Sequence, residues 1–382
     1  MLWFSYLKHK YALTEIDYSR LQNIETTVLT MLLAPMFTCE GAILLKQVPV
    51  HQAIGMTLCH DITRVIPGIY KGVGFKKGHI IQSDDIPLLL DMGKEHIYVW
   101  DNQNMVHEDE AAQRIAQSAA GEGLVSIPVG EGKVNLVSVY PGLLKIDTSA
   151  LHEINSIDQI LIATLHNNQW TPQNKIVAGT RVIPLLVEKE KVKKAEEICQ
   201  LSYPLLTIKP LKVMNIGMVT TGSEIYYGRI PDAFGPVVTR KIDCMGSRIS
   251  RQIIVTDDKE MIAQAIHTLL NEGVEMIVVT GGMSVDPDDR TPGGIEAAGG
   301  QIAAYGAPVL PGSMFMIAYL GKIPVLGLPA CVLHASVTVF DLLLPRLLAG
   351  ETLERRDLID LGHGGLCSIC PDCHFPDCGF GK

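Results

Sequence analysis

Two mainly apolar segments that each end in a glycine turn constrain the fold of this chain more than any other feature. Residues 214–219 lead into a turn at Gly222, and residues 274–279 lead into a turn at Gly281. Such segments are typical of strands that are buried on both faces of a parallel sheet. Residues 259–271, between them, have the periodicity of an amphipathic helix. Strands and helices in this order indicate βαβ units, so we expect a parallel sheet with helices on both sides.

The same alternation continues to residue 350 and predicts the other elements of this domain. We expect helices at 237–245, 292–298 and 332–348, and strands at 249–255, 301–305, 314–320 and 324–328. The predicted fold class is therefore α/β, with a three-layer domain and a mostly parallel sheet over residues 206–351. Such sheets bind ligands at the carboxyl ends of their strands, which is where both glycine turns lie.

The preceding part of the chain has a different pattern. Residues 45–205 combine short apolar segments with frequent Gly and Pro. Helices are predicted at 108–120 and 188–200, and a linker is predicted at 202–209. This pattern favours a β-rich, mixed α+β region of several small subdomains, which we interpret as a lid or dimerisation platform. To the leader, residues 1–44, we assign no role.

Composition argues against two classes of partner. The chain has 32 basic and 41 acidic side chains, a formal net charge of −9 and no basic block, so we expect no nucleic-acid surface. No apolar run reaches the roughly 20 residues that cross a bilayer, so we expect no membrane span. Acidic residues precede the short apolar run at 28–37, where a secretory signal has basic ones. We therefore expect a cytoplasmic protein.

An acidic loop follows the second glycine turn. Asp286, Asp288 and Asp289 come just before the helix that Pro292 begins. Glycine turns after strands offer free N–H groups that attract an anion such as a phosphate. Carboxylates beside such a turn suit a Mg²⁺ ion that bridges carboxylate and phosphate oxygens. The alternative is a solvated acidic turn that only caps the following helix.

Together these motifs resemble the molybdopterin-binding domain of the molybdopterin molybdenumtransferase (MoeA and gephyrin E domain) family. The resemblance covers residues 213–351, with the motifs in the family's order and at matching spacing, and the front half is only faintly similar. The motifs are Thr221-Gly-Ser-Glu-Ile, Asp257 before a helix, Thr280-Gly-Gly-Met-Ser-Val-Asp-Pro-Asp-Asp, Leu310-Pro-Gly and Gly327-Leu-Pro.

The resemblance implies a role in molybdenum cofactor biosynthesis: the Mg²⁺-dependent insertion of molybdate into adenylated molybdopterin. By position, it implies that Asp289, Glu224 and Asp257 are the catalytic carboxylates and that Asp289 also holds Mg²⁺. It also implies an elongated homodimer. The molybdopterin-binding positions that it implies are Thr221, Gly222, Ser223, Gly281, Gly282, Ser284, Pro311 and Gly312.

Some positions depart from the family's pattern. Where the family has basic residues around its P-G turn, this chain has Leu310 and Ser313. Where the family has G-N-P after G-L-P, this chain has Ala330-Cys-Val. Charge that would neutralise an anionic substrate is thereby lost. A second interpretation therefore stays open, a non-catalytic molybdopterin carrier or sensor that could serve a molybdoenzyme client.

The last segment, residues 352–382, holds four of the nine cysteines. Cys367, Cys370, Cys373 and Cys378 have the spacing C-x2-C-x2-C-x4-C. Such a set of thiols is typical of a metal site, either an iron-sulfur cluster or a tetrahedral Zn²⁺. The segment is too short for a core of its own. We therefore expect it to gain its order from the metal and to be dispensable for folding of the sheet.

Overall fold

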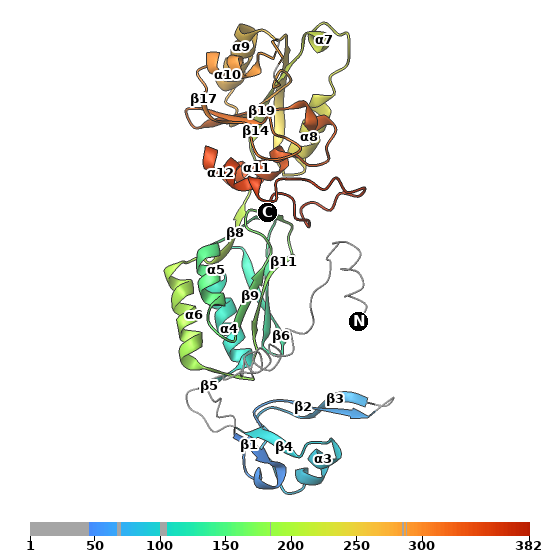
Figure 1. Cartoon of the computed structure of the whole chain (residues 1–382), viewed down its shortest axis with the longest axis vertical. Helices are drawn as coiled ribbons and strands as arrows, with labels where there is room; N and C mark the ends of the chain where they lie inside the picture. The colour runs from blue at the N-terminus through green and yellow to red at the C-terminus, as the bar shows by residue number, and fades with distance from the viewer. Residues whose placement is uncertain (1–45, 67–69, 100–104, 184, 285, 288) are drawn as a thin grey trace, which may run out of the picture.

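The computed structural model describes residues 46–66, 70–99, 105–183, 185–284, 286–287 and 289–382. It has three bodies in a row along its long axis (Figure 1). They are an N-terminal body (46–99), a middle body (105–210) and an α/β domain (211–382). The predicted leader lies outside the described residues. None of the helices in the described ranges combines the length with the apolar composition that a membrane span requires.

A six-stranded sheet of order β15-β14-β16-β19-β18-β17 forms the centre of the α/β domain. The first four strands are parallel, and β18 and β17 join antiparallel. The prediction of a mostly parallel sheet is confirmed. The strands are β14 (Asn215–Thr221), β15 (Arg248–Val255), β16 (Met276–Thr280), β17 (Gln301–Tyr305), β18 (Met316–Leu320) and β19 (Ile323–Leu328).

Helices cover both faces of this sheet, which makes the three predicted layers. On one face, a buried cluster joins Met218 of β14 to Val238 and Phe340. On the other face, a second cluster joins Val219 of β14 to Ile266 and Ile295. The helices are α7 (Ser223–Tyr226), α8 (Phe234–Asp243), α9 (Lys259–Asn271), α10 (Thr291–Ala297) and α11 (Val339–Leu348).

One predicted helix is wrong at its start. Instead of a continuous helix over 332–348, the chain forms a short 3-10 turn, η3 (Ala330–Leu333), and then begins α11 at Val339. Thr338 caps α11, because its hydroxyl accepts a hydrogen bond from the amide of Phe340 while its own amide donates to Asp341. The break leaves a loop between β19 and α11 on the edge where the glycine turns lie.

The middle body has three helices on one face of the antiparallel sheet β6-β7-β11-β9 (Figure 1). The predicted linker 202–209 is wrong in its second half, because β13 pairs with β8 and Leu206 is fully buried. The elements are β5 (Met105–His107), α4 (Glu108–Ala119), β6 (Leu124–Gly130), β7 (Lys133–Ser138), β8 (Gly142–Ile146), α5 (Thr148–Asn155), β9 (Ile160–Thr164), β10 (Trp170–Thr171), β11 (Ile176–Val182), β12 (Leu186–Glu188), α6 (Lys189–Leu201) and β13 (Leu206–Pro210).

The N-terminal body is a small unit with its own core. It consists of two antiparallel strand pairs, β1-β4 and β2-β3, with a short helix beside them. Leu58, Leu89 and Ile97 belong to its buried cluster. The elements are β1 (Lys46–Pro49), η2 (Val50–Gln52), β2 (Ile62–Ile66), β3 (Tyr70–Phe75), α3 (Asp85–Asp91) and β4 (His96–Val99).

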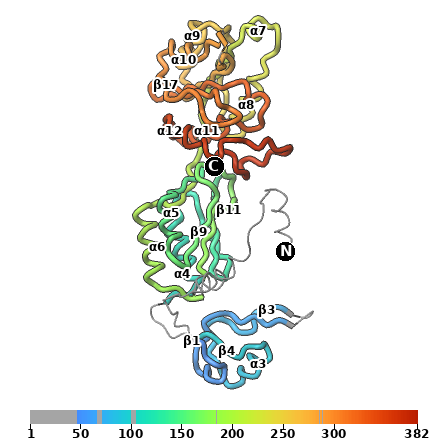
Figure 2. The backbone as a smooth tube through the Cα atoms, viewed as in Figure 1, coloured from blue at the N-terminus to red at the C-terminus, as the bar shows by residue number. Residues whose placement is uncertain are grey.

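The cysteine-rich tail packs against the α/β domain and lies between that domain and the middle body (Figure 2). It begins with α12 (Arg355–Ile359) and η4 (Asp360–Gly362). Leu353, Leu358 and Phe380 are buried in the same cluster as β14. The expectation that metal binding orders this segment is therefore corrected, because burial of apolar side chains already holds it.

Candidate functional site

The two glycine turns meet at one edge of the sheet. β14 and β16 are neighbours, with Thr220 opposite Thr280, so the turns that follow them lie side by side. A cavity of about 610 Å³ opens at this point. Its lining consists of Thr221, Gly222, Glu224, Ile225, Ile230, Pro231, Ala233, Phe234, Asp257, Gly281, Gly282, Asp286, Pro287, Asp289, Ala330 and Leu333. We call it the glycine-turn cavity.

The contact between the turns depends on glycine. Gly281 has a φ of +87°, and a Cβ atom there would lie 2.4 Å from the carbonyl oxygen of Thr221. Any other residue would therefore push the turns apart. Thr291, at the start of α10, donates a hydrogen bond to the carbonyl oxygen of Gly281, and its hydroxyl lies 3.3 Å from that of Thr221. The strand ends and α10 are thus fixed to one another.

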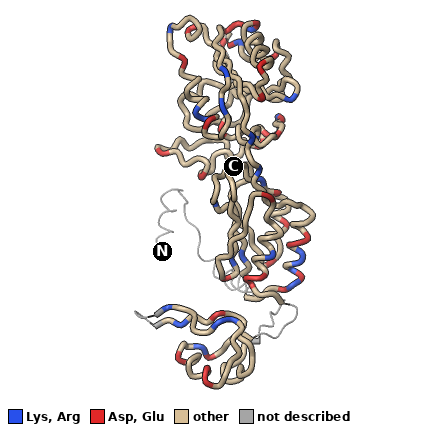
Figure 3. Tube along the Cα trace, turned by 180° about the vertical axis from the view of Figure 1, so that it is seen from behind, with Lys and Arg blue, Asp and Glu red and all other residues tan. Residues whose placement is uncertain are grey.

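Four carboxylates line the glycine-turn cavity: Glu224, Asp257, Asp286 and Asp289. Its described lining includes no Lys or Arg. Elsewhere, basic and acidic residues are interspersed along the three bodies (Figure 3). Uncompensated like charges in one cavity favour a cation, or an anion that arrives with one.

The carboxylates differ in what they contact. Asp257 accepts hydrogen bonds from the amide and the hydroxyl of Ser223, and so fixes the first turn. Asp289 accepts one from the amide of Asp286 at 3.1 Å, and its own amide donates to the Asp286 carbonyl oxygen. Burial, together with the charge of Asp289, raises the pKa of Tyr305, whose hydroxyl donates to the Met283 carbonyl. The acidic loop is therefore folded on itself beside the cavity.

The structure does not bring every residue implied by the resemblance to this cavity. Ser223, Ser284, Pro311 and Gly312 are not part of its lining. Ser223 turns its hydroxyl toward Asp257. Gly312 lies against the start of α11, where an added Cβ would be 2.7 Å from Val339. Other lining residues, such as Phe234 and Leu333, were missed, because an apolar residue that lines a cavity has the same pattern as one in the core.

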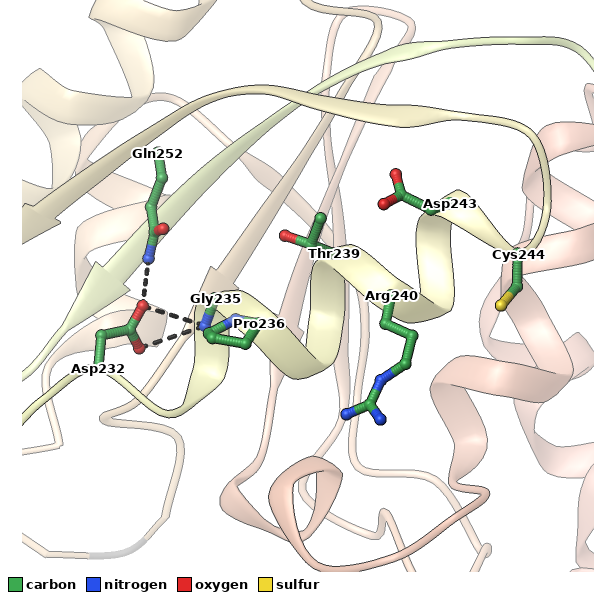
Figure 4. A pocket seen from close by; sticks show the side chains of 8 residues that line it. All are labelled: Asp232, Gly235, Pro236, Thr239, Arg240, Asp243, Cys244 and Gln252. Atoms are coloured by element: carbon green, nitrogen blue, oxygen red, sulfur yellow. Dashed lines mark hydrogen bonds between the residues drawn. The ribbon is translucent and has the colours of Figure 1, made fainter.

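A second cavity, of about 710 Å³, follows the exposed side of α8 (Figure 4). Asp232, just before the N-cap residue of this helix, accepts hydrogen bonds from the amides of Phe234 and Gly235 through its carboxylate. Gln252 donates to Asp232 at 2.6 Å and to Thr220 at 2.8 Å. The start of α8, which borders the glycine-turn cavity, is thereby tied to the end of β14.

A third cavity, of about 590 Å³, lies between α8, the loop before α11 and the tail. It shares Leu333 with the glycine-turn cavity. Arg240, Cys244, His334 and Cys373 are among its lining residues. We call it the tail cavity.

The four tail cysteines are not gathered at one point. Within the described ranges, no group of three or more His, Cys, Asp or Glu side chains is placed to hold a metal ion. Cys370 and Cys373 are exposed, while Cys367 and Cys378 are half-buried. The predicted tail metal site therefore stays a prediction.

Comparison with known families assigns two of the three bodies. Residues 217–349 match the model of the family described as "Probable molybdopterin binding domain". Residues 47–101 match a domain family of unknown function.

Curated relatives match only a part of this chain. A CinA-like protein of Flavobacterium psychrophilum is 33% identical over 78 residues, and that match covers 20% of this chain and 18% of the relative. A molybdopterin molybdenumtransferase of Synechococcus elongatus is 26% identical over 144 residues, 35% of this chain and 36% of the relative. The chain thus matches about a fifth of the length of the CinA-like relative.

Solved structures show weaker likeness. The molybdopterin biosynthesis enzyme MoaB of Thermus theromophilus has a TM-score of 0.30 and 18% identity, covering 36% of this chain and 98% of that one. The molybdopterin biosynthesis moea protein of Pyrococcus horikosii has a TM-score of 0.31 and 14% identity, covering 80% and 74%. Residues 217–349 thus match the probable molybdopterin-binding family, and residues 47–101, on the far side of the middle body, match a domain family of unknown function.

Proposed function

We propose that the glycine-turn cavity binds molybdopterin, and that the chain inserts molybdate into adenylated molybdopterin there. The observation that supports this most is the lining of the cavity, in which two strand-end glycine turns lie beside four carboxylates. The matching family is described by molybdopterin binding, and one relative is named for the transfer of molybdenum. The proposal thus joins the geometry of the cavity to the family of the domain that holds it.

The turns would bind the phosphate end of the ligand. Gly222, Gly281 and Gly282 all have positive φ and no side chain between backbone and cavity. Their backbone can therefore approach an anion closely. Asp257, by holding the amide and hydroxyl of Ser223, would keep the first turn in its binding shape.

The acidic loop would hold Mg²⁺. Asp286 and Asp289 offer oxygen ligands on one side of the cavity, and Mg²⁺ is commonly held by one or two carboxylates together with substrate phosphate and water. The absence of a larger preformed group among the described residues is compatible with this mode. When bound, Mg²⁺ supplies positive charge that stabilises the anionic oxygens of the reacting phosphoanhydride. Asp289 and Glu224 would fix the ligand relative to it.

The test is Asp289→Asn, measured separately for molybdopterin binding and for molybdate insertion. We expect binding within about tenfold of wild type and loss of insertion, because a carboxylate that acts through a metal contributes mainly to the transition state. Asp243→Asn is the matched control, since Asp243 is exposed on α8 and lies outside the glycine-turn cavity. Insertion by Asp289→Asn at the wild-type rate would refute the role of this residue.

One observation favours a second function, a molybdopterin carrier or sensor. The described lining of the cavity has no Lys or Arg to neutralise molybdate or a leaving phosphate. A carrier needs only the turns, whereas a transferase also needs the carboxylates. Wild-type protein that binds molybdopterin but does not convert it, with or without Mg²⁺ and molybdate, would select the carrier, with a molybdoenzyme as its client.

We also propose that the chain forms a homodimer. The face of the middle sheet opposite its helices exposes Ile127, Leu161 and Ile176 to between 43% and 52%. An exposed apolar sheet face of this kind is typical of an interface. Light scattering should give twice the chain mass of 41.7 kDa. Ile127→Lys should shift the protein to monomer, and a wild-type monomer would refute the proposal.

A further inference from the structure

The contact between the N-terminal body and the middle body, which we call the joint, is small. The two bodies have separate buried cores, one with Leu58 and Ile97 and the other with Val106 and Ile115. In the described part of the chain, no helix or strand of the N-terminal body packs closely on one of the middle body. Bodies that meet in this way can move relative to each other. The few side chains buried in the joint therefore decide whether the two bodies stay together.

His107, at the end of β5, is buried in this joint and contacts both bodies. Its side chain is 3% exposed. The ring nitrogen Nδ1 accepts a hydrogen bond from the amide of Asp109 at 3.2 Å, and His107 thereby caps α4. The ring also interacts with the backbone of Cys59, in the N-terminal body. One imidazole thus links the start of α4 to the N-terminal body.

The cap of α4 requires a neutral imidazole. A ring nitrogen that accepts a hydrogen bond carries no proton, so Nδ1 of His107 is unprotonated in this structure. A proton there would break the bond from the Asp109 amide and would place a cation at the N-terminus of α4, where the helix dipole is positive. A carboxylate oxygen of Asp109, 3.6 Å from Nδ1, would favour the proton, although the other oxygen already accepts from the amide of Gly132. The closed joint is therefore built for the uncharged ring.

The charged groups around the ring come from both bodies. Burial lowers the pKa of His107 from its ordinary value of 6.5, and the charges of Lys77 and His60 lower it further, whereas Asp109 and the Cys59 backbone act in the opposite direction. Lys77 and His60 belong to the N-terminal body, so both charges act on the ring across the joint. The pKa of His60 is itself lowered, first by burial. A ring that leaves the joint is released from burial and from both of these charges.

We propose that His107 is a pH-sensitive latch, whose protonation releases the N-terminal body from the middle body. The exposed ring of an open form takes up a proton more readily than the buried ring of the closed form, so acid favours the open form. The joint is therefore stable above pH 6.5, the ordinary pKa of histidine, and weakens as the pH falls below it. The latch lies in another body than the glycine-turn cavity, so it does not depend on the function proposed for that cavity.

Glu108 is a second titratable group at the start of α4. Burial raises its pKa, as does the charge of Asp109, while Arg181 and Lys77 lower it. Its attraction to Lys77 acts across the joint and is also lost in acid. Glu108→Gln removes this carboxylate and leaves His107 in place, so the variant separates the two groups. The proposal requires that Glu108→Gln keep the pH response of the wild type.

The first experiment uses the wild-type chain. Its radius of gyration is measured by small-angle X-ray scattering from about pH 8 to about pH 5, the range in which histidine titrates. Light scattering on the same samples gives the mass, so that a change of assembly is recognised. The ring of His107 is followed in parallel by NMR, with its signal assigned from a variant. We expect the ring to titrate below pH 6.5 and the radius of gyration to rise reversibly with the same midpoint, at constant mass. A constant radius of gyration, or a ring that titrates at or above pH 6.5, would overturn the proposal.

The second experiment compares variants by the same scattering measurement. His107→Asn introduces a favoured helix cap that cannot be protonated, so the pH response should be lost. His107→Lys is charged throughout and should be open already at about pH 8. His152→Asn is the matched control, because His152 is exposed on α5, and it should respond like wild type. Opening of His107→Asn at the wild-type pH, or loss of the response in Glu108→Gln or His152→Asn, would overturn the proposal. No readout uses molybdopterin, so these results stand apart from those on the glycine-turn cavity.

Discussion

Carboxylates lie at two ends of the α/β domain, and they differ in whether they have ion-pair partners. At the glycine-turn cavity, Glu224, Asp257, Asp286 and Asp289 have no ion pair among the described residues. At the tail end, Glu351 contacts Arg346 and Lys145, each within 2.8 Å, and Asp357 contacts Arg346 at 2.5 Å. The carboxylates at the tail end are held by ion pairs, whereas those at the cavity have only hydrogen bonds from nearby Ser223 and Asp286. Charge left uncompensated beside a cavity is typical of a ligand site.

The largest expected effect comes from removing the tail end of the domain, where the carboxylates are in ion pairs. We call it the paired end. A chain truncated after Gly350 loses Glu351 and three buried side chains, Leu353, Leu358 and Phe380. Each buried apolar side chain contributes about 2–5 kcal/mol. We expect the cooperative unfolding transition of the domain to be lost or moved far down in temperature, as measured by calorimetry.

Single variants localise that effect. Phe380→Ala should lower the melting temperature clearly, whereas Leu366→Ala, on an exposed side chain, should leave it nearly unchanged. A truncated chain that unfolds like wild type would restore the expectation from the sequence that the tail is dispensable.

The next largest effect concerns the paired guanidinium. Arg346→Ala leaves Asp357 without its ion-pair partner and leaves Glu351 with Lys145 and Lys209 only. The free energy of unfolding should fall by an amount toward the lower end of the roughly 3–5 kcal/mol that breaking a buried pair costs. Arg356→Ala is the control, because Arg356 is 87% exposed and faces Asp360 at 3.8 Å. Its cost should stay below about 0.5 kcal/mol. Equal effects of the two variants in a urea titration would contradict the comparison.

Acid should act on the paired end as well. Burial opposes ionisation of Glu351, but hydrogen bonds from Lys145 and Arg346 outweigh it and lower the pKa. For Asp357, burial is likewise outweighed by the Glu354 amide and Arg346, and the pKa is lowered. At a pH above their ordinary pKa values, 4.5 for Glu351 and 3.8 for Asp357, both ionised carboxylates therefore stabilise the folded state. This stabilisation is lost as the pH falls through their lowered pKa values in the folded protein.

Unfolding measured from neutral pH down into this range should show a steep loss in wild type. The loss should be shallower in Arg346→Ala, which has less pairing left to lose. A pH dependence that is identical in the two proteins would place its source elsewhere.

The smallest effect is expected at the unpaired end. Asp289→Asn should change the free energy of unfolding by no more than about 0.5 kcal/mol, and any change should be toward higher stability, because one like charge is removed from a shared cavity. The measurement is the urea midpoint. A clear destabilisation would show that Asp289 has a structural role like that of Asp357.

The sequence predicts the centre of the sheet well, because burial on both faces gives β14, β16 and β19 a mainly apolar pattern. Residues 259–271 were expected as a helix and are α9, whose cap Asp258 accepts a hydrogen bond from Met261. The break before Val339 was not expected. The apolar pattern runs through it, and only the cap at Thr338 marks the start of α11.

The sequence predicts the glycine turns of the candidate site, but it predicts fewer of the other residues that line the cavity. Gly222 and Gly281 were expected together, because parallel strands end at one edge of a sheet, and the structure puts both in one cavity. Gly312 was placed there by resemblance alone and packs instead on Val339. The packing of the tail on the domain was not expected, because short apolar anchors such as Leu358 and Phe380 give no periodic signal.

The arrangement of three bodies in a row has a consequence for access. The N-terminal body and the edge that bears α7 and the glycine turns lie at opposite ends of the molecule (Figure 1). In this arrangement the N-terminal body does not reach the glycine-turn cavity of its own chain. If an N-terminal body covers a ligand bound there, it belongs to a second chain, and the cover then depends on protein concentration and is lost on dilution.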